Sequence, residues 1–128
     1  MTEYIEAYGG LGIITDDTQM SLITVEALQQ ALDASALMEP SPEGVEALGE
    51  GWIAEEALAI AVYAALVHEN DIKAALLLAV NHGGDSDSTG AITGNLLGAA
   101  RGLVGTPNEW VTANEVTALV AAATEALV

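Results

Sequence analysis

Two short acidic segments combine the residue types that could bind a hard metal ion. The first is Thr15-Asp16-Asp17-Thr18, and the second is Asp85-Ser86-Asp87-Ser88-Thr89. Divalent ions such as Mg²⁺ prefer oxygen ligands, and carboxylates packed together repel one another unless a cation lies between them. Lys73 and Arg101 are the only Lys or Arg side chains in the sequence. We therefore predict a metal site built from two segments that lie far apart along the chain.

Each acidic segment also has a purely structural interpretation. Thr and Asp are favoured helix caps, and acids are favoured in a first helical turn, so Thr15-Asp16-Asp17-Thr18 could simply begin a helix. In the second segment, Gly83-Gly84 gives the backbone freedom for an unusual turn. Asp85 and Asp87, two residues apart, can then direct their carboxylates to a common centre, with the Ser88 hydroxyl as a neutral oxygen. The second segment is therefore the stronger candidate for binding.

Helical patterns surround both acidic segments. Apolar residues at helical spacing, together with capping residues and glycine or proline breaks, predict helices. The predicted ranges are 17–35, 53–68, 72–81 with Asp71 as its N-cap, 88–103, and a last helix over 112–127. Proline and glycine predict an irregular linker over 38–51. Because no segment alternates with a period of two, we expect an all-α fold, a compact bundle of about five helices in one domain over 1–128.

Four glycines fall every fourth residue along the predicted fourth helix: Gly90, Gly94, Gly98 and Gly102. Glycine costs about 1 kcal/mol relative to alanine inside a helix. A shared glycine face therefore predicts the close approach of another helix, with the close approach of a ligand as the alternative.

Several side chains near the acidic segments have two interpretations each. His82 could reach the metal site as a hydrogen-bond donor, but a histidine at a helix C-terminus more often contacts the last carbonyls. Trp52 could stack on an adenine or simply pack in the fold. Glu55 and Glu56 begin a helix, where acids are favoured electrostatically, and a catalytic role is the alternative.

The composition excludes several classes of protein. A formal net charge of −17 argues against nucleic-acid binding and against docking on an anionic membrane. The absence of cysteine excludes disulfides and thiolate metal sites. We see neither a signal peptide nor an apolar run long enough for a membrane span, so a cytoplasmic protein is expected. The acidity as a whole is typical of a solvated surface, including one adapted to salt.

Longer motifs around these residues resemble a known family. Residues 81–94, Asn-His-Gly-Gly-Asp-Ser-Asp-Ser-Thr-Gly-Ala-Ile-Thr-Gly, resemble the C-terminal metal motif of the ADP-ribosylglycohydrolase family. Residues 15–20 resemble its N-terminal metal motif, and residues 49–58 and 107–110 resemble further stretches in the same order. The resemblance implies an orthogonal all-α bundle with a binuclear Mg²⁺ centre, in which Mn²⁺ could replace Mg²⁺.

The resemblance also implies which residues bind the two ions and which take part in catalysis. Asp87 matches the carboxylate that contacts both ions, and Ser88 replaces a threonine of the family while keeping its hydroxyl. Asp85 and Asp87 are the expected catalytic residues, and no other cofactor is implied. The implied metal ligands are Thr15, Asp16, Asp17, Asp85, Asp87 and Ser88.

The function implied by the resemblance is hydrolysis of a glycosidic bond of ADP-ribose. The substrate would be ADP-ribose, an ADP-ribosylated protein or a related metabolite. The sequence departs from the family pattern because it lacks the N-terminal helix and the central region that cradles the pyrophosphate, so we expect a shortened member. A homo-oligomer could restore the missing pocket walls. The alternatives are an impaired remnant that binds metal, with or without ADP-ribose, and a structural or interaction domain.

Overall fold

Helices make up all the regular structure in the described part of the chain. The computed structural model describes residues 16–112 and 117–125, and these contain no strand. The helices among them are α1 (Asp16–Leu37), α2 (Pro42–Glu46), α3 (Ala54–Val67), α4 (Ile72–Val80), α5 (Ser86–Arg101), α6 (Asn108–Thr112) and α7 (Thr117–Glu125). The all-α prediction is therefore confirmed. Because α2 and α6 have only five residues each, the longer helices number about five, as expected.

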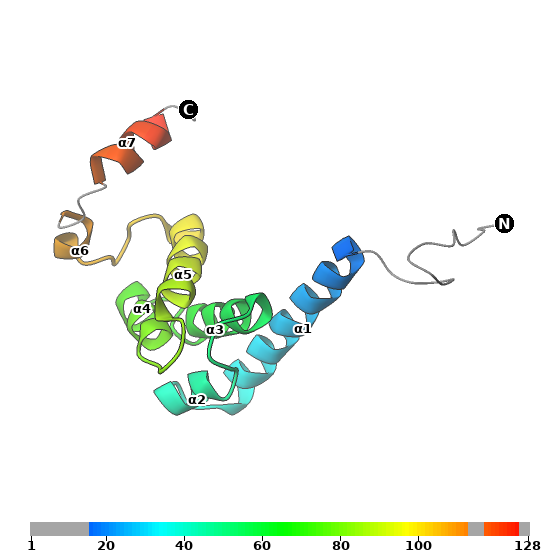
Figure 1. The fold of residues 1–128 in the computed structure, drawn as a ribbon. Helices are drawn as coiled ribbons and strands as arrows, with labels where there is room; N and C mark the ends of the chain where they lie inside the picture. The colour runs from blue at the N-terminus through cyan, green and yellow to red at the C-terminus, as the bar shows by residue number, and fades with distance from the viewer. Residues whose placement is uncertain (1–15, 113–116, 126–128) are drawn as a thin grey trace.

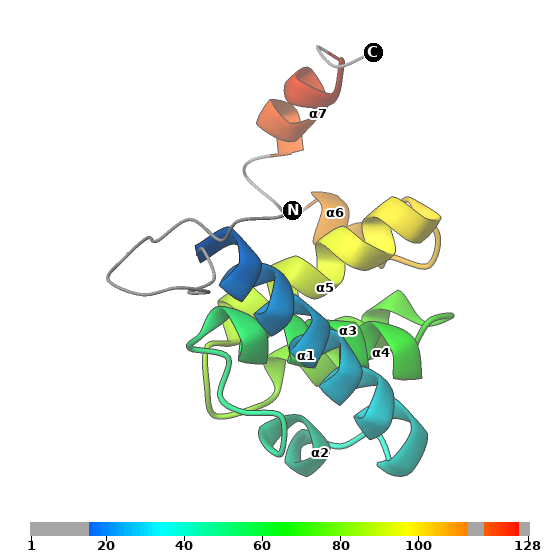
Figure 2. The ribbon, with the colours of Figure 1, turned by 90° about the vertical axis from the view of Figure 1, so that its right-hand side faces the viewer.

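Helix α3 occupies the centre of the packed group. It packs against α1, α4 and α5, and α4 also packs against α5. In Figure 1, α3 lies between α1 on one side and α4 and α5 on the other, and Figure 2 shows the same group from a perpendicular direction. No helix in the described part of the chain is long and apolar enough to cross a membrane.

Most predicted helix boundaries agree with the structure to within a few residues. The Asp71 carboxylate accepts a 3.0 Å hydrogen bond from the Ala74 N–H, so this N-cap prediction is confirmed. Helix α5 begins at Ser86, two residues earlier than predicted. Helix α7 falls within the last predicted range, of which residues 113–116 lie outside the described part.

The prediction of an irregular linker over 38–51 is partly wrong, because α2 lies within it. The Ser41 hydroxyl accepts a 3.1 Å hydrogen bond from the Gly44 N–H, and Pro42 occupies the first turn. A serine N-cap followed by proline is a strong helix start. Here this start signal outweighs the helix-breaking tendency of Gly44, which is buried in the structure.

Small and aliphatic side chains form the core around α3. Tyr63 is the largest fully buried side chain, and its hydroxyl donates a 3.2 Å hydrogen bond to the Glu39 carbonyl. Burial, and then the charge of Glu39, raise the pKa of the Tyr63 phenol. Alanines let the helix backbones approach closely around this ring. The buried residues of this cluster are Ala31, Ala34, Val45, Ile60, Tyr63, Ala64, Leu78 and Ala79.

The glycine face of α5 packs closely over only half of its length. A Cβ at Gly90 would lie 2.7 Å from Val80 Cγ1, and a Cβ at Gly94 would lie 3.6 Å from Leu76 Cδ2. At Gly98, by contrast, an added Cβ would meet no described atom within 4 Å beyond its chain neighbours and the backbone of its own helix. Gly102 ends the helix with a φ of +63°. The helix-packing interpretation is thus right for the two glycines that face α4 and wrong for the other two.

Candidate metal centre and its supporting loops

Oxygen donors of the second acidic segment gather at the start of α5. Asp85 occupies the N-cap position and Asp87 the first turn. Hydrogen bonding with the Asp87 carboxyl, and then with the Ser88 hydroxyl, lowers the pKa of Asp85. Asp85 and Ser88 are partly buried and Asp87 is exposed, so the three side chains lie at the surface around the first turn of α5. Two carboxyls and a hydroxyl form the kind of donor set that Mg²⁺ prefers, so these residues fit the predicted metal.

The first acidic segment, Thr15-Asp16-Asp17-Thr18, has its predicted ligands outside the described side chains. Thr15 lies outside the described residues, and Asp16 and Asp17 open α1 with side chains that also lie outside the described part. Among the described side chains, no group of three or more His, Cys, Asp or Glu could hold a metal ion. The meeting of the two segments therefore stays a prediction.

The loop that leads into α5 packs backbone against backbone on the loop before α3. The Asp85 N–H donates a 2.7 Å hydrogen bond to the Glu50 carbonyl. A Cβ at Gly84 would overlap the Glu50 backbone, and Gly51 is buried with a φ of +79°. Only glycine fits at both positions, because a side chain would either clash or adopt a strained conformation. The Gly49–Gly51 loop thus supports the acidic segment directly.

His82 connects this turn to the interior of α5. Its Nδ1 accepts a 3.2 Å hydrogen bond from the Gly84 N–H, so in the neutral ring Nε2 carries the proton. Nε2 lies 3.0 Å from the Thr89 hydroxyl, which in turn donates a 2.7 Å hydrogen bond to the Ala79 carbonyl. The prediction that His82 contacts the last carbonyls of its helix is wrong. That contact belongs to Thr89, and His82 orients the turn instead.

Thr89→Val should measure the stability that this buried network provides. Thr89 is fully buried, and valine keeps its shape while leaving the Ala79 carbonyl and His82 without their partner. We expect a loss of about 1–3 kcal/mol in unfolding free energy, measured by urea denaturation. Thr93→Val is the matched control, because among the described residues the buried Thr93 hydroxyl bonds only the Thr89 carbonyl, within the same helix. Equal losses in the two variants would contradict a special role for Thr89.

A polar hollow lies beside the candidate centre. Its volume is about 340 Å³, and it is lined by Glu46, Gly49, Glu50, His82, Gly83 and Gly84. Trp52 lies next to this loop and is 65% exposed, and its indole N–H donates a 3.1 Å hydrogen bond to the Glu50 carboxylate. The packing interpretation of Trp52 is therefore wrong.

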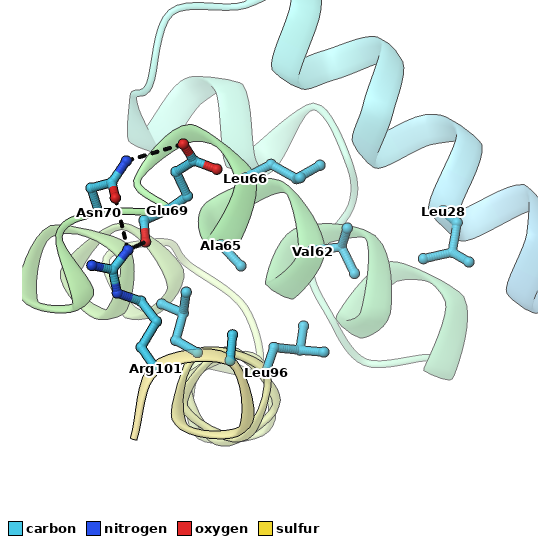
Figure 3. Close-up of a pocket in the computed structure, with 10 residues that line it drawn as sticks. Leu28, Val62, Ala65, Leu66, Glu69, Asn70, Leu96 and Arg101 are labelled. Atoms are coloured by element: carbon cyan, nitrogen blue, oxygen red, sulfur yellow. Dashed lines mark hydrogen bonds between the residues drawn. The ribbon is translucent and has the colours of Figure 1, made fainter. Parts of the chain in front are cut away.

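A larger hollow lies elsewhere, between α1, α3 and α5 (Figure 3). It measures about 530 Å³, and mainly apolar side chains line it, so its chemistry does not suit a metal. Arg101 at its edge donates hydrogen bonds to the Glu69 carbonyl (2.6 Å) and to the Asn70 side chain (2.8 Å). The other cation, Lys73, lies 5.9 Å from the centre of the Trp110 ring. Both cations thus join helices to neighbouring segments.

The described residues are thus helical, with Asp85 and Asp87 at the start of α5. The family model described as ADP-ribosylglycohydrolase matches residues 27–128. This match covers most of the sequence, and the chain belongs to the ADP-ribosylglycohydrolase family. The matched range contains the second acidic segment and begins after the first. No curated protein and no solved structure matches the chain.

Proposed function

We propose that the chain hydrolyses a glycosidic bond of ADP-ribose with the help of two Mg²⁺ ions. Membership of the family supports the reaction class, which is hydrolysis of ADP-ribosylated substrates. The single observation that carries the proposal is the position of Asp85 at the N-cap and of Asp87 in the first turn of α5, inside the range that the family model matches. The substrate would be an ADP-ribosylated protein or a related ADP-ribose metabolite.

The proposed ligands of the two ions are Thr15, Asp16, Asp17, Asp85, Asp87 and Ser88. Bound Mg²⁺ supplies orientation, Lewis acidity and a more acidic water. Four carboxylates against two divalent ions leave a roughly neutral centre, which could accept an anionic substrate. Cleavage of a glycosidic bond develops positive charge at the anomeric carbon, and the carboxylates of Asp85 and Asp87 would stabilise that charge.

A metal-binding remnant without efficient turnover is the second candidate. Arg101 and Lys73 are the only Lys or Arg residues in the sequence, and each already contacts a neighbouring segment. A pyrophosphate therefore finds no obvious cationic partner. Correct positioning of a substrate can account for about 7–11 kcal/mol of a barrier. This observation favours slow turnover over turnover at rates typical of enzymes.

The test is release of ADP-ribose from modified arginine and modified serine peptides in the presence of Mg²⁺. We expect metal-dependent release slower than about 1 s⁻¹, and a further decrease of about 100-fold in Asp87→Asn, since that carboxylate acts on the developing charge. Release at about 1 s⁻¹ or faster would show that the local contacts of Arg101 and Lys73 do not limit the reaction. No release and no binding of ADP-ribose would support the remnant.

A further inference from the structure

Glu56 makes contacts that a simple acidic helix start would not make. It lies in the first turn of α3, and one oxygen, Oε2, accepts hydrogen bonds from the backbone N–H groups of Glu50 and Gly51, each 3.1 Å long. A Cβ at Gly49, which has a φ of +120°, would lie 2.5 Å from Glu56 Cδ. The Gly49–Gly51 loop is therefore wrapped around this carboxylate.

The same loop holds the candidate metal centre from its other side. The Glu50 carbonyl accepts the 2.7 Å hydrogen bond from the Asp85 N–H, and Gly84 packs directly on the Glu50 backbone. The backbone of Glu50 is thus bound twice, its N–H by Glu56 and its C=O by Asp85. A continuous chain of contacts leads from α3 through Glu50 to the backbone of Asp85, the N-cap residue of α5.

We propose that Glu56 is a positioning residue for Asp85. The inference rests on the proposed function, because Asp85 is a proposed metal ligand. Hydrogen bonds that a carboxylate accepts are stronger than neutral ones, so Glu56 can hold the loop firmly. Residues that orient metal ligands typically change metal affinity by about 10–100-fold when they are replaced. By this account Glu56 acts through the backbone and touches neither metal nor substrate.

Glu55 provides a natural control for this role. It lies in the same first turn of α3 and carries the same charge at the same helix end. Its side chain lines a different hollow, together with Met20 and Ile23 of α1. Replacement of Glu55 therefore removes the same charge from the start of α3 as replacement of Glu56 does. It leaves the hydrogen bonds from the loop to Glu56 Oε2 in place.

The experiment compares the full chain carrying Glu56→Ala, Glu56→Gln or Glu55→Ala with the wild type. Mn²⁺ affinity is measured by the paramagnetic signal of the free ion, and exchange of the Asp85 amide hydrogen is followed by NMR. We expect Glu56→Ala to weaken Mn²⁺ binding about tenfold and to speed exchange at Asp85. Glutamine keeps an acceptor oxygen, so Glu56→Gln should retain most of both properties. Glu55→Ala should match the wild type.

The two readouts separate the positioning role from the metal site itself. Wild-type protein that binds no Mn²⁺ would refute the metal centre, and the exchange rate of Asp85 would still decide whether Glu56 positions that residue. Equal exchange at Asp85 in Glu56→Ala and Glu55→Ala would overturn the proposal. Equal loss of Mn²⁺ affinity in Glu56→Ala and Glu55→Ala would also overturn it, because general charge would then explain the effect. If Glu56→Ala does not fold, Glu56→Asp is used instead. Its shorter side chain should no longer reach the N–H groups of Glu50 and Gly51.

Discussion

Mg²⁺ should raise the melting temperature of this protein by roughly 10 °C when the ion is present at about 100 times its dissociation constant. The physical reason is that Asp85 and Asp87 lie two residues apart at the start of α5 in a chain with a formal charge of −17, so a bound cation offsets excess negative charge. Metal that binds only the folded chain adds its binding free energy to stability. Thermal unfolding followed by circular dichroism, with Mg²⁺ and with EDTA, measures the difference.

Asp87→Asn should remove most of this gain while leaving the metal-free protein at least as stable as the wild type. The substitution deletes a proposed ligand, and an asparagine amide can still donate to the Asp85 carboxylate. Asp71→Asn is the matched control, because it removes one charge at the start of α4 and asparagine caps helices as well as aspartate does. Melting curves that coincide in Mg²⁺ and in EDTA, at equal ionic strength, would rule out a metal site.

The local signals in the sequence were sufficient to predict the positions of the helices. Asp71 caps α4 as expected, and the dense apolar run of α3 became the centre of the fold. The structure departs from the prediction where two local signals compete. In α2, the Ser41-Pro42 start prevails over Gly44, and the opposite outcome was expected. Such competition is decided by packing, because Gly44 is buried against the core.

The donors of the candidate centre could be predicted from residue types, whereas the contacts that hold them could not. Two carboxylates two residues apart beside Gly83-Gly84 already indicate convergence. The bond from Asp85 to Glu50 joins segments 35 residues apart, and nothing local in either segment specifies it. One sequence signal could have indicated the role of Glu56. It is an acid at the start of a helix, placed a few residues after the glycines of the Gly49–Gly51 loop, whose N–H groups it binds. The side chains of the first acidic segment lie outside the described residues.

Gly84→Ala should be among the most damaging single substitutions in the chain. An added Cβ would overlap the carbonyl of Glu50, and neither backbone can move without breaking the bond from the Asp85 N–H. Overpacking against a fixed backbone costs about 3 kcal/mol, which corresponds to a decrease of roughly 10 °C in melting temperature for a chain of this size. The response to Mg²⁺ should shrink as well, because the displaced loop carries Asp85.

Gly98→Ala is the control that gives the Gly84 result its meaning. Gly98 lies inside α5, where an added Cβ would meet no described atom within 4 Å beyond its chain neighbours and the backbone of its own helix, so alanine should stabilise the helix by up to about 1 kcal/mol. The same chemical change is thus expected to have opposite signs at two glycines, and urea denaturation of both variants measures the difference. A Gly84→Ala protein as stable as the wild type would show that the two loops do not pack backbone to backbone. In that case the support for Asp85 through Glu50, and the role inferred for Glu56, would also lose their structural basis.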